Sequence, residues 1–162
     1  MVLLQTFIKS LKLPNKQAMF KLNRIGMDIT VVYLFILLLL VSAPSLVNQL
    51  TSSDSAGTVM SLPFFLIYFF IFSYLPLTIA VFIYISLLSY AGTGIAKLLR
   101  RKIRFSILWK LNAYTTTIPF ILYSIIAFFF SITDAFLVLF ILYSFIFMFK
   151  MITVYPKRKK RP

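Results

Sequence analysis

The residues that could carry chemistry are few, and their kinds limit what this chain can catalyse. Its 162 residues include three acids, Asp28, Asp54 and Asp134, and they include no Glu, His or Cys. General acid–base catalysis and metal binding usually draw on clusters of such side chains. Because the three aspartates are far apart in the sequence, we predict no catalytic, metal or cofactor site.

A polar cluster inside an apolar run is the most unusual feature of the chain. Asn112 and Thr116 lie one helical turn apart, and Pro119 follows. Pro119 lacks the N–H that would bond to the carbonyl of Thr115, and neighbouring hydroxyls can replace that bond. Two interpretations stay open, a purely structural role and a hinge or partner-binding face. Pro76, which should kink another apolar run, belongs to the same candidate set.

Lys150 is the one charge inside a predicted membrane span. A Ser–Lys dyad is conceivable there. Lys150 lies about one turn from the end of its span, however, so its ammonium group can reach water at the interface. We therefore predict that the protein is not an enzyme.

Composition assigns the chain to the integral membrane proteins. Hydrophobic residues make up 61% of it, and the mean hydropathy is +0.98. All seventeen Lys and Arg fall in three stretches, residues 9–24, 97–110 and 150–161. Basic loops are retained on the cytoplasmic side of a membrane. We predict a multi-pass protein of the bacterial cytoplasmic membrane with both termini in the cytoplasm.

The expected fold is an all-α membrane protein with four transmembrane helices. A cytoplasmic segment 1–28 precedes the membrane domain 29–154, and a basic tail 155–162 follows it. The four spans are expected at residues 29–47, 61–90, 111–131 and 135–154. Residues 48–60 should form an outer loop, and a short turn around Asp134 should join the last two spans as an antiparallel hairpin.

Two alternatives to these spans are less consistent with the sequence. Signal-peptidase cleavage after Ala43 is disfavoured, because the preceding basic region is long and Pro44 follows the bond. Residues 61–90 could form a hairpin of two half-spans. That hairpin would place the basic stretch 97–110 outside, against the charge rule, so one crossing is preferred.

Two basic segments should lie on the inner lipid surface. In residues 3–11, apolar side chains recur at helical spacing, which predicts an amphipathic interfacial helix. Residues 91–110 predict a second one, with Trp109 at headgroup level, and nucleic-acid binding is disfavoured because the apolar stripe would face water. The basic residues expected to contact anionic headgroups are Lys9, Lys12, Arg100, Arg101, Lys102, Lys157, Arg158, Lys159, Lys160 and Arg161.

Three segments carry a resemblance to a known family. They are Phe7 to Pro14 with Arg24-Ile25-Gly26, the run from Leu108 to Pro119, and Tyr155-Pro156-Lys157. Together they resemble a family of membrane proteins of Gram-positive bacteria that are often labelled maltodextrin-utilisation proteins. Members commonly carry a substantial region between the first two spans, whereas this chain has only residues 48–60. The resemblance implies a location in the membrane and an association with sugar uptake.

Three functions are consistent with the sequence. The favoured one is a non-enzymatic accessory or regulatory membrane protein that packs against another membrane protein, such as a sugar-uptake transporter. The alternative is a subunit of a small oligomeric transporter or channel, since four spans alone are few for a pore. An intramembrane enzyme is the third, and it would depend on Lys150 and Asp134.

Overall fold

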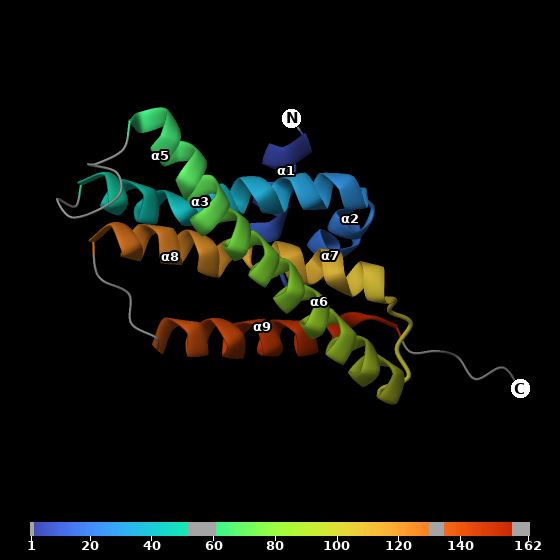
Figure 1. The fold of residues 1–162 in the computed structure, drawn as a ribbon. Coiled ribbons are helices and arrows are strands. Elements are labelled where there is room, and N and C mark those ends of the chain that lie inside the picture. Colours follow the sequence, from blue (N-terminus) through green and yellow to red (C-terminus); the bar gives the residue numbers. More distant parts are fainter. Residues whose placement is uncertain (1, 52–60, 130–134, 157–162) are drawn as a thin grey trace, which may run out of the picture.

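The computed structural model describes residues 2–51, 61–129 and 135–156, and these residues form helices and short links (Figure 1). The elements are α1 (Val2–Leu11), α2 (Lys16–Asn23), α3 (Met27–Thr51), α5 (Leu62–Phe69), the π-helical turn η1 (Phe70–Tyr74), α6 (Leu75–Leu98), α7 (Phe105–Thr115), α8 (Thr117–Phe129) and α9 (Ala135–Val154). Four stretches are long and apolar enough to cross a membrane: α3, α5 through α6, α7 with α8, and α9. This confirms the predicted all-helical fold with four such helices and a short apolar N-terminal helix.

The helix α7 lies at the centre of the bundle. It packs along α6 and against α3 and α9, while α8 continues its line and packs along α3. The buried share of the most apolar part is 56% in the third span, 17% in the second and 22% in the fourth. The core is therefore built around the third span, and the second and fourth spans lie at its periphery.

The first span is longer than predicted. It was expected over residues 29–47, whereas α3 begins at Met27 and ends at Thr51, so the helix takes in the start of the predicted outer loop. Pro44 lies inside this helix and cannot donate to the carbonyl of Leu40. The hydroxyl of Ser124 on α8 lies 3.4 Å from that carbonyl oxygen. The same hydroxyl lies 2.9 Å from the carbonyl oxygen of Phe120, so its single proton can bond to only one of the two carbonyls at a time.

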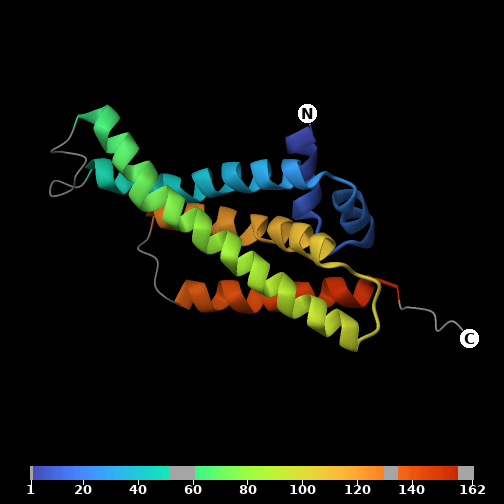
Figure 2. The same cartoon turned by 45° about the vertical axis from the view of Figure 1, so that its right-hand side comes forward.

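The second span is one helical stretch, Leu62–Leu98, so it does not fold back as a hairpin of two half-spans. Just before Pro76 it contains the π-helical turn η1, and the N–H of Leu75 bonds to the carbonyl of Phe70. A π-turn re-spaces the backbone bonds next to a residue that cannot donate one. At 1.5 Å per residue the stretch is about 55 Å long, beyond the ~30 Å of a hydrocarbon core. It accordingly lies oblique to the bundle (Figure 2).

The prediction of a separate inner helix at residues 91–110 is wrong. Helix α6 continues to Leu98 and α7 begins at Phe105, so only residues 99–104 link the two spans. Trp109 is 5% exposed, and its indole N–H donates to the hydroxyl of Ser86 at 3.1 Å. The packing of α6 against α7 covers only part of the apolar residues: Ala96 and Leu108 are buried, whereas Leu98 is 85% exposed. The sequence pattern did not show which of them a neighbouring helix would cover.

A sharp turn follows α6 at Arg100, which has a φ of 52°. The N–H of Arg101 bonds to the carbonyl of Ala96, and the N–H of Arg100 bonds to that of Lys97. These two bonds form a Schellman motif, in which glycine is usual at the position of Arg100. The turn returns the chain to α7.

The helix α1 lies across the bundle axis in both views (Figures 1 and 2). Its small polar residues Thr6 and Ser10 are fully buried toward the bundle, while Leu4 and Ile8 on the apolar stripe are exposed. This helix therefore has the predicted amphipathic form, with its apolar side turned outward. Helix α2 buries Met19 and Leu22 completely as it packs against α7.

Helices α8 and α9 are antiparallel neighbours, as the predicted hairpin requires, but large rings separate them. Phe120 and Phe140 stack with centroids 5.3 Å apart, and Tyr123 and Phe136 are 5.4 Å apart. The turn around Asp134 lies outside the described residues. The described basic residues belong to segments at one end of the bundle, where α2 ends, α7 begins and α9 ends (Figure 1).

Candidate functional site

The polar run Asn112 to Thr117 lies where the third span is interrupted. Helix α7 ends at Thr115 and α8 begins at Thr117, with Thr116 between them. The hydroxyls of these three threonines donate to the carbonyls of Leu111, Ala113 and Tyr114 at 2.7–2.9 Å. Such back-bonding loosens a helix, and Pro119 withholds one further donor. The interruption therefore follows from the local sequence.

Two tyrosines join this interruption to the N-terminal part of the chain. The hydroxyl of Tyr33 on α3 lies 3.1 Å from that of Ser10 and 2.8 Å from that of Thr117. The hydroxyl of Tyr114 lies 2.7 Å from that of Thr30, and the two tyrosine rings are 5.5 Å apart. We call these five residues the tyrosine network. It connects α1, α3, α7 and α8 through buried neutral hydroxyls.

A second pair of bonds joins α7 to α6. The side-chain amide of Asn112 donates to the hydroxyl of Ser89 at 2.9 Å, one turn from the Trp109–Ser86 bond. Asn112 is 2% exposed, and its carbonyl oxygen has no hydrogen-bond partner among the described residues. A buried acceptor of this kind is costly unless water or another donor reaches it.

Three of the four residues of the candidate hinge or partner face lie together in the third span, and Pro76 does not join them. Asn112, Thr116 and Pro119 are buried within the bundle, so in this arrangement they do not present an outer face. Pro76 is exposed, and it precedes Ser89 by thirteen residues, or about 20 Å of helix. A hinge at the interruption stays a prediction, and any outer face must be sought elsewhere.

Comparison with known proteins identifies the family of the chain. A family model described as a protein of unknown function (DUF1189) matches residues 46–152. The chain belongs to the DUF1189 family. No curated protein and no solved structure matches it. The DUF1189 region contains the second, third and fourth spans, and the N-terminal helices and most of α3 precede it.

The N-terminal helices are attached to the DUF1189 region by a lysine that sequence reasoning treated as one more loop cation. The ammonium group of Lys110 on α7 donates to the carbonyls of Asn23 at 2.6 Å and Ile25 at 2.9 Å. Asn23 is the last residue of α2 and Ile25 follows the helix, and a positive charge is favoured at such a helix end because its last carbonyls lack helical partners. No sequence signal identifies this contact, because the partners are backbone atoms far away in the chain.

The basic residues expected at the lipid surface have different surroundings. Lys12, Arg100 and Lys102 are exposed, and Lys9 is half-buried, so these four can reach a headgroup layer. The guanidinium of Arg101 instead donates to the carbonyl of Tyr155. The five tail residues Lys157, Arg158, Lys159, Lys160 and Arg161 lie outside the described part of the chain.

The described polar groups of this site form hydrogen bonds between helices. In the described residues no three His, Cys, Asp or Glu side chains gather as metal ligands. The described acid, Asp28, is exposed in the first turn of α3. The tyrosine network and the Asn112 contact can fix helices relative to one another and can rearrange when helices move.

Proposed function

We propose that this protein is a non-enzymatic accessory or regulatory integral membrane protein that binds another membrane protein along α5 and η1. The observation that carries the proposal is the position of this part of the chain. The start of α5 projects beyond the rest of the bundle (Figures 1 and 2), and the buried side chains of α5 and η1 are Phe65, Phe69 and Tyr74, so the other side of this segment is uncovered. A helix that its own bundle leaves uncovered has a free side for a partner helix.

The side chains on this segment are those that make strong helix contacts. Phe64 is 70% exposed and Phe72 is 64% exposed, with Ile67 and Ile71 also exposed between them. Large rings provide much contact area and lose little conformational freedom on binding. The π-turn next to them marks an irregular backbone, and such turns are frequent at functional sites.

The buried polar groups support a role without catalysis. Those of the tyrosine network and the Asn112 contact are hydroxyls and an amide, which stay neutral and pair largely with one another. Groups of this kind specify how helices pack. They are suited to a protein that transmits or stabilises an arrangement of spans.

We further propose that the partner takes part in sugar uptake in a Gram-positive bacterium. This part rests on the resemblance to proteins labelled for maltodextrin utilisation. Deletion of the gene should then slow growth on maltodextrin and leave growth on glucose unchanged. Equal growth of the deletion strain and the parent on both sugars would contradict this part of the proposal.

Photo-crosslinking in native membranes tests the binding surface. A photoreactive residue would replace Phe64 or Phe72 on the proposed surface, and Leu139 or Ile146 on α9 as controls. The controls are matched, since both are 63% exposed. The same protein adduct from Phe64 and Phe72, and none from α9, would support the proposal. Lipid adducts alone at all four positions would refute it.

A transporter or channel subunit is the second candidate, and one hollow favours it. About 340 Å³ of space lies between α3, the stretch from the end of α5 through η1 into α6, α8 and α9. It is lined by rings and by the hydroxyl-bearing residues Ser42, Ser45, Ser73 and Tyr123. The packed residues of α7 close the bundle beyond it, so a path would need several copies of the chain. Flux into proteoliposomes together with a defined oligomer would support this candidate, and a monomer without flux would remove it.

We propose that the basic end of the bundle faces the cytoplasm, with both termini inside. The positive-inside rule supports this orientation. Because the chain has no cysteine, single cysteines can report it without background. In intact cells an impermeant maleimide should label Thr51→Cys and spare Lys102→Cys. The reverse pattern would invert the topology.

A further inference from the structure

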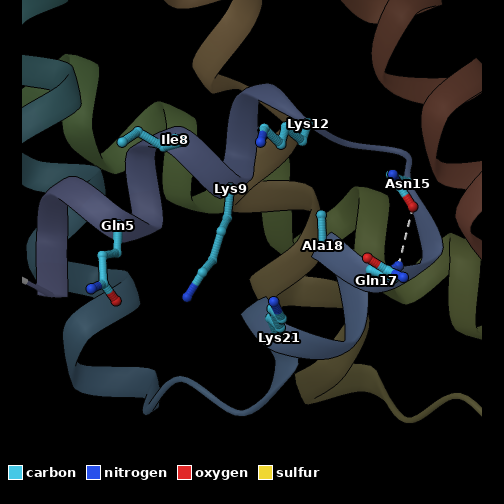
Figure 3. A pocket seen from close by; sticks show the side chains of 8 residues that line it. All are labelled: Gln5, Ile8, Lys9, Lys12, Asn15, Gln17, Ala18 and Lys21. Carbon is cyan, nitrogen blue, oxygen red and sulfur yellow. Dashed lines mark hydrogen bonds between the residues drawn. The ribbon is translucent and has the colours of Figure 1, made fainter.

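A hollow of about 330 Å³ lies between α1 and α2, before the DUF1189 region begins. Three of the residues that line it are lysines: Lys9 from α1, Lys12 from the turn that follows α1, and Lys21 from α2. Figure 3 shows the side chain of Lys9 extending into the space between the two helices. Gln5 and Gln17 add side-chain amides to the wall. The hollow therefore gathers hydrogen-bond donors from two helices.

The charges around this hollow are all of one sign. No carboxylate is found among the described residues that line it. Like charges placed around one space repel each other, and an anion between them is attracted by all three. Ammonium groups are common ligands of phosphate in proteins. The chemistry of the wall thus fits a phosphate group.

The surroundings of the hollow fit a lipid. Ile8, which also lines it, is 46% exposed, and Leu4 beside it on α1 is 68% exposed. Helix α1 lies across the bundle, so it would run along the membrane surface if the four long helices span the bilayer (Figure 2). Its place is fixed by the contact between Ser10 and Tyr33. Cationic and apolar side chains therefore meet on one element at the depth where phospholipids change from headgroup to acyl chain.

We propose that the hollow between α1 and α2 is a binding site for the phosphate headgroup of an anionic phospholipid. Lys9, Lys12 and Lys21 hold the phosphate, and the acyl chains lie beside Leu4 and Ile8. This site differs from general attraction of a basic surface to the membrane, because three defined lysines and not the total charge determine it. It is also independent of the protein partner proposed above.

Native mass spectrometry of the full chain in mild detergent tests the site. The probes are phosphatidylglycerol, phosphatidylcholine and inorganic phosphate. The site variant replaces Lys9, Lys12 and Lys21 by Gln. The matched control replaces Lys16, Lys97 and Lys102 by Gln, which removes the same charge from exposed positions outside the hollow. Thermal unfolding of both variants establishes that they remain folded.

The unmodified chain should retain phosphatidylglycerol in preference to phosphatidylcholine. Each lysine lost from the site should weaken retention about fivefold, the value expected for one basic residue near an anionic lipid surface. The control variant should retain the lipid like the unmodified chain. Equal losses in the two variants would show general charge attraction and overturn the site. Displacement of the lipid by equimolar inorganic phosphate would overturn the assignment to a lipid headgroup.

Discussion

Replacement of Gly92 by alanine should destabilise the bundle, because Gly92 lies where α6, α7 and α9 meet. A Cβ atom at this position would lie 2.5 Å from Cδ2 of Leu108 and 2.6 Å from Sδ of Met148. Carbon atoms in contact are ordinarily 3.5–4.0 Å apart, so both side chains must move by about 1 Å. Leu108 is 0% exposed and Met148 is 1% exposed, which leaves them little free space to enter.

Gly94 provides the control, since a Cβ there meets nothing within 4 Å. Both glycines lie in α6, and alanine is favoured over glycine in a helix by about 1 kcal/mol in each case. This helical gain cancels when the two variants are compared. The remaining difference is the overpacking cost at Gly92, which is about 1–3 kcal/mol. Gly92→Ala should thus be less stable than Gly94→Ala by that amount.

Thermal unfolding in detergent measures the difference. For a chain of this length, each kcal/mol corresponds to about 2–4 °C in the unfolding midpoint. Met148→Ala should cost less stability in Gly92→Ala than in the unmodified chain, because it removes one of the two obstructing atoms. Equal midpoints for Gly92→Ala and Gly94→Ala would refute the close approach of the three helices.

Three further changes test other contacts. Tyr33→Phe removes the centre of the tyrosine network and should cost about 1 kcal/mol of stability, measured by thermal unfolding. Lys110→Met should free the end of α2 and speed its release by trypsin, whereas Lys150→Met, at an exposed site, should not. Arg100→Gly should stabilise the chain by about 1 kcal/mol, because its φ of 52° strains any residue but glycine. Arg104→Gly, with a φ of −99°, should give no such gain.

A specific result would contradict each of these three predictions. An unchanged unfolding midpoint for Tyr33→Phe would mean that the network adds nothing to stability. Equal trypsin release in both lysine variants would place the attachment of α2 elsewhere. A loss of stability in Arg100→Gly as large as in Arg104→Gly would remove the strain argument.

Hydropathy and charge predicted the four long apolar helices, but they did not predict how those helices cover one another. The fourth span was placed at its observed bounds, 135–154, because apolar runs are continuous there. The prediction of a separate helix at 91–110 was wrong, because helical spacing of apolar residues does not show that the stretch is divided between the ends of two long helices. Trp109 shows the consequence, since it is buried against α6 with its N–H bonded.

The candidate site was predictable only in its local part. The interruption near Thr116 follows from three threonines and Pro119, which are close together in the chain. The direction in which Asn112 and Thr116 point was not predictable, because a helix surrounded by other helices has no polar face to reveal. The tyrosine network joins residues 84 positions apart, and no spacing rule covers such a pair.

The sequence by itself determined which segments are apolar enough to cross a membrane and at which end of the bundle the cations gather. These properties depend on transfer from water to lipid, which each segment undergoes largely on its own. Only the tertiary structure decided that Lys110 bonds to the end of α2 and that three lysines line one hollow. It also decided that the side chains of Leu108 and Met148 pack against Gly92, where a Cβ atom would not fit. Those contacts join segments distant in the chain, and their geometry arises only when the helices pack.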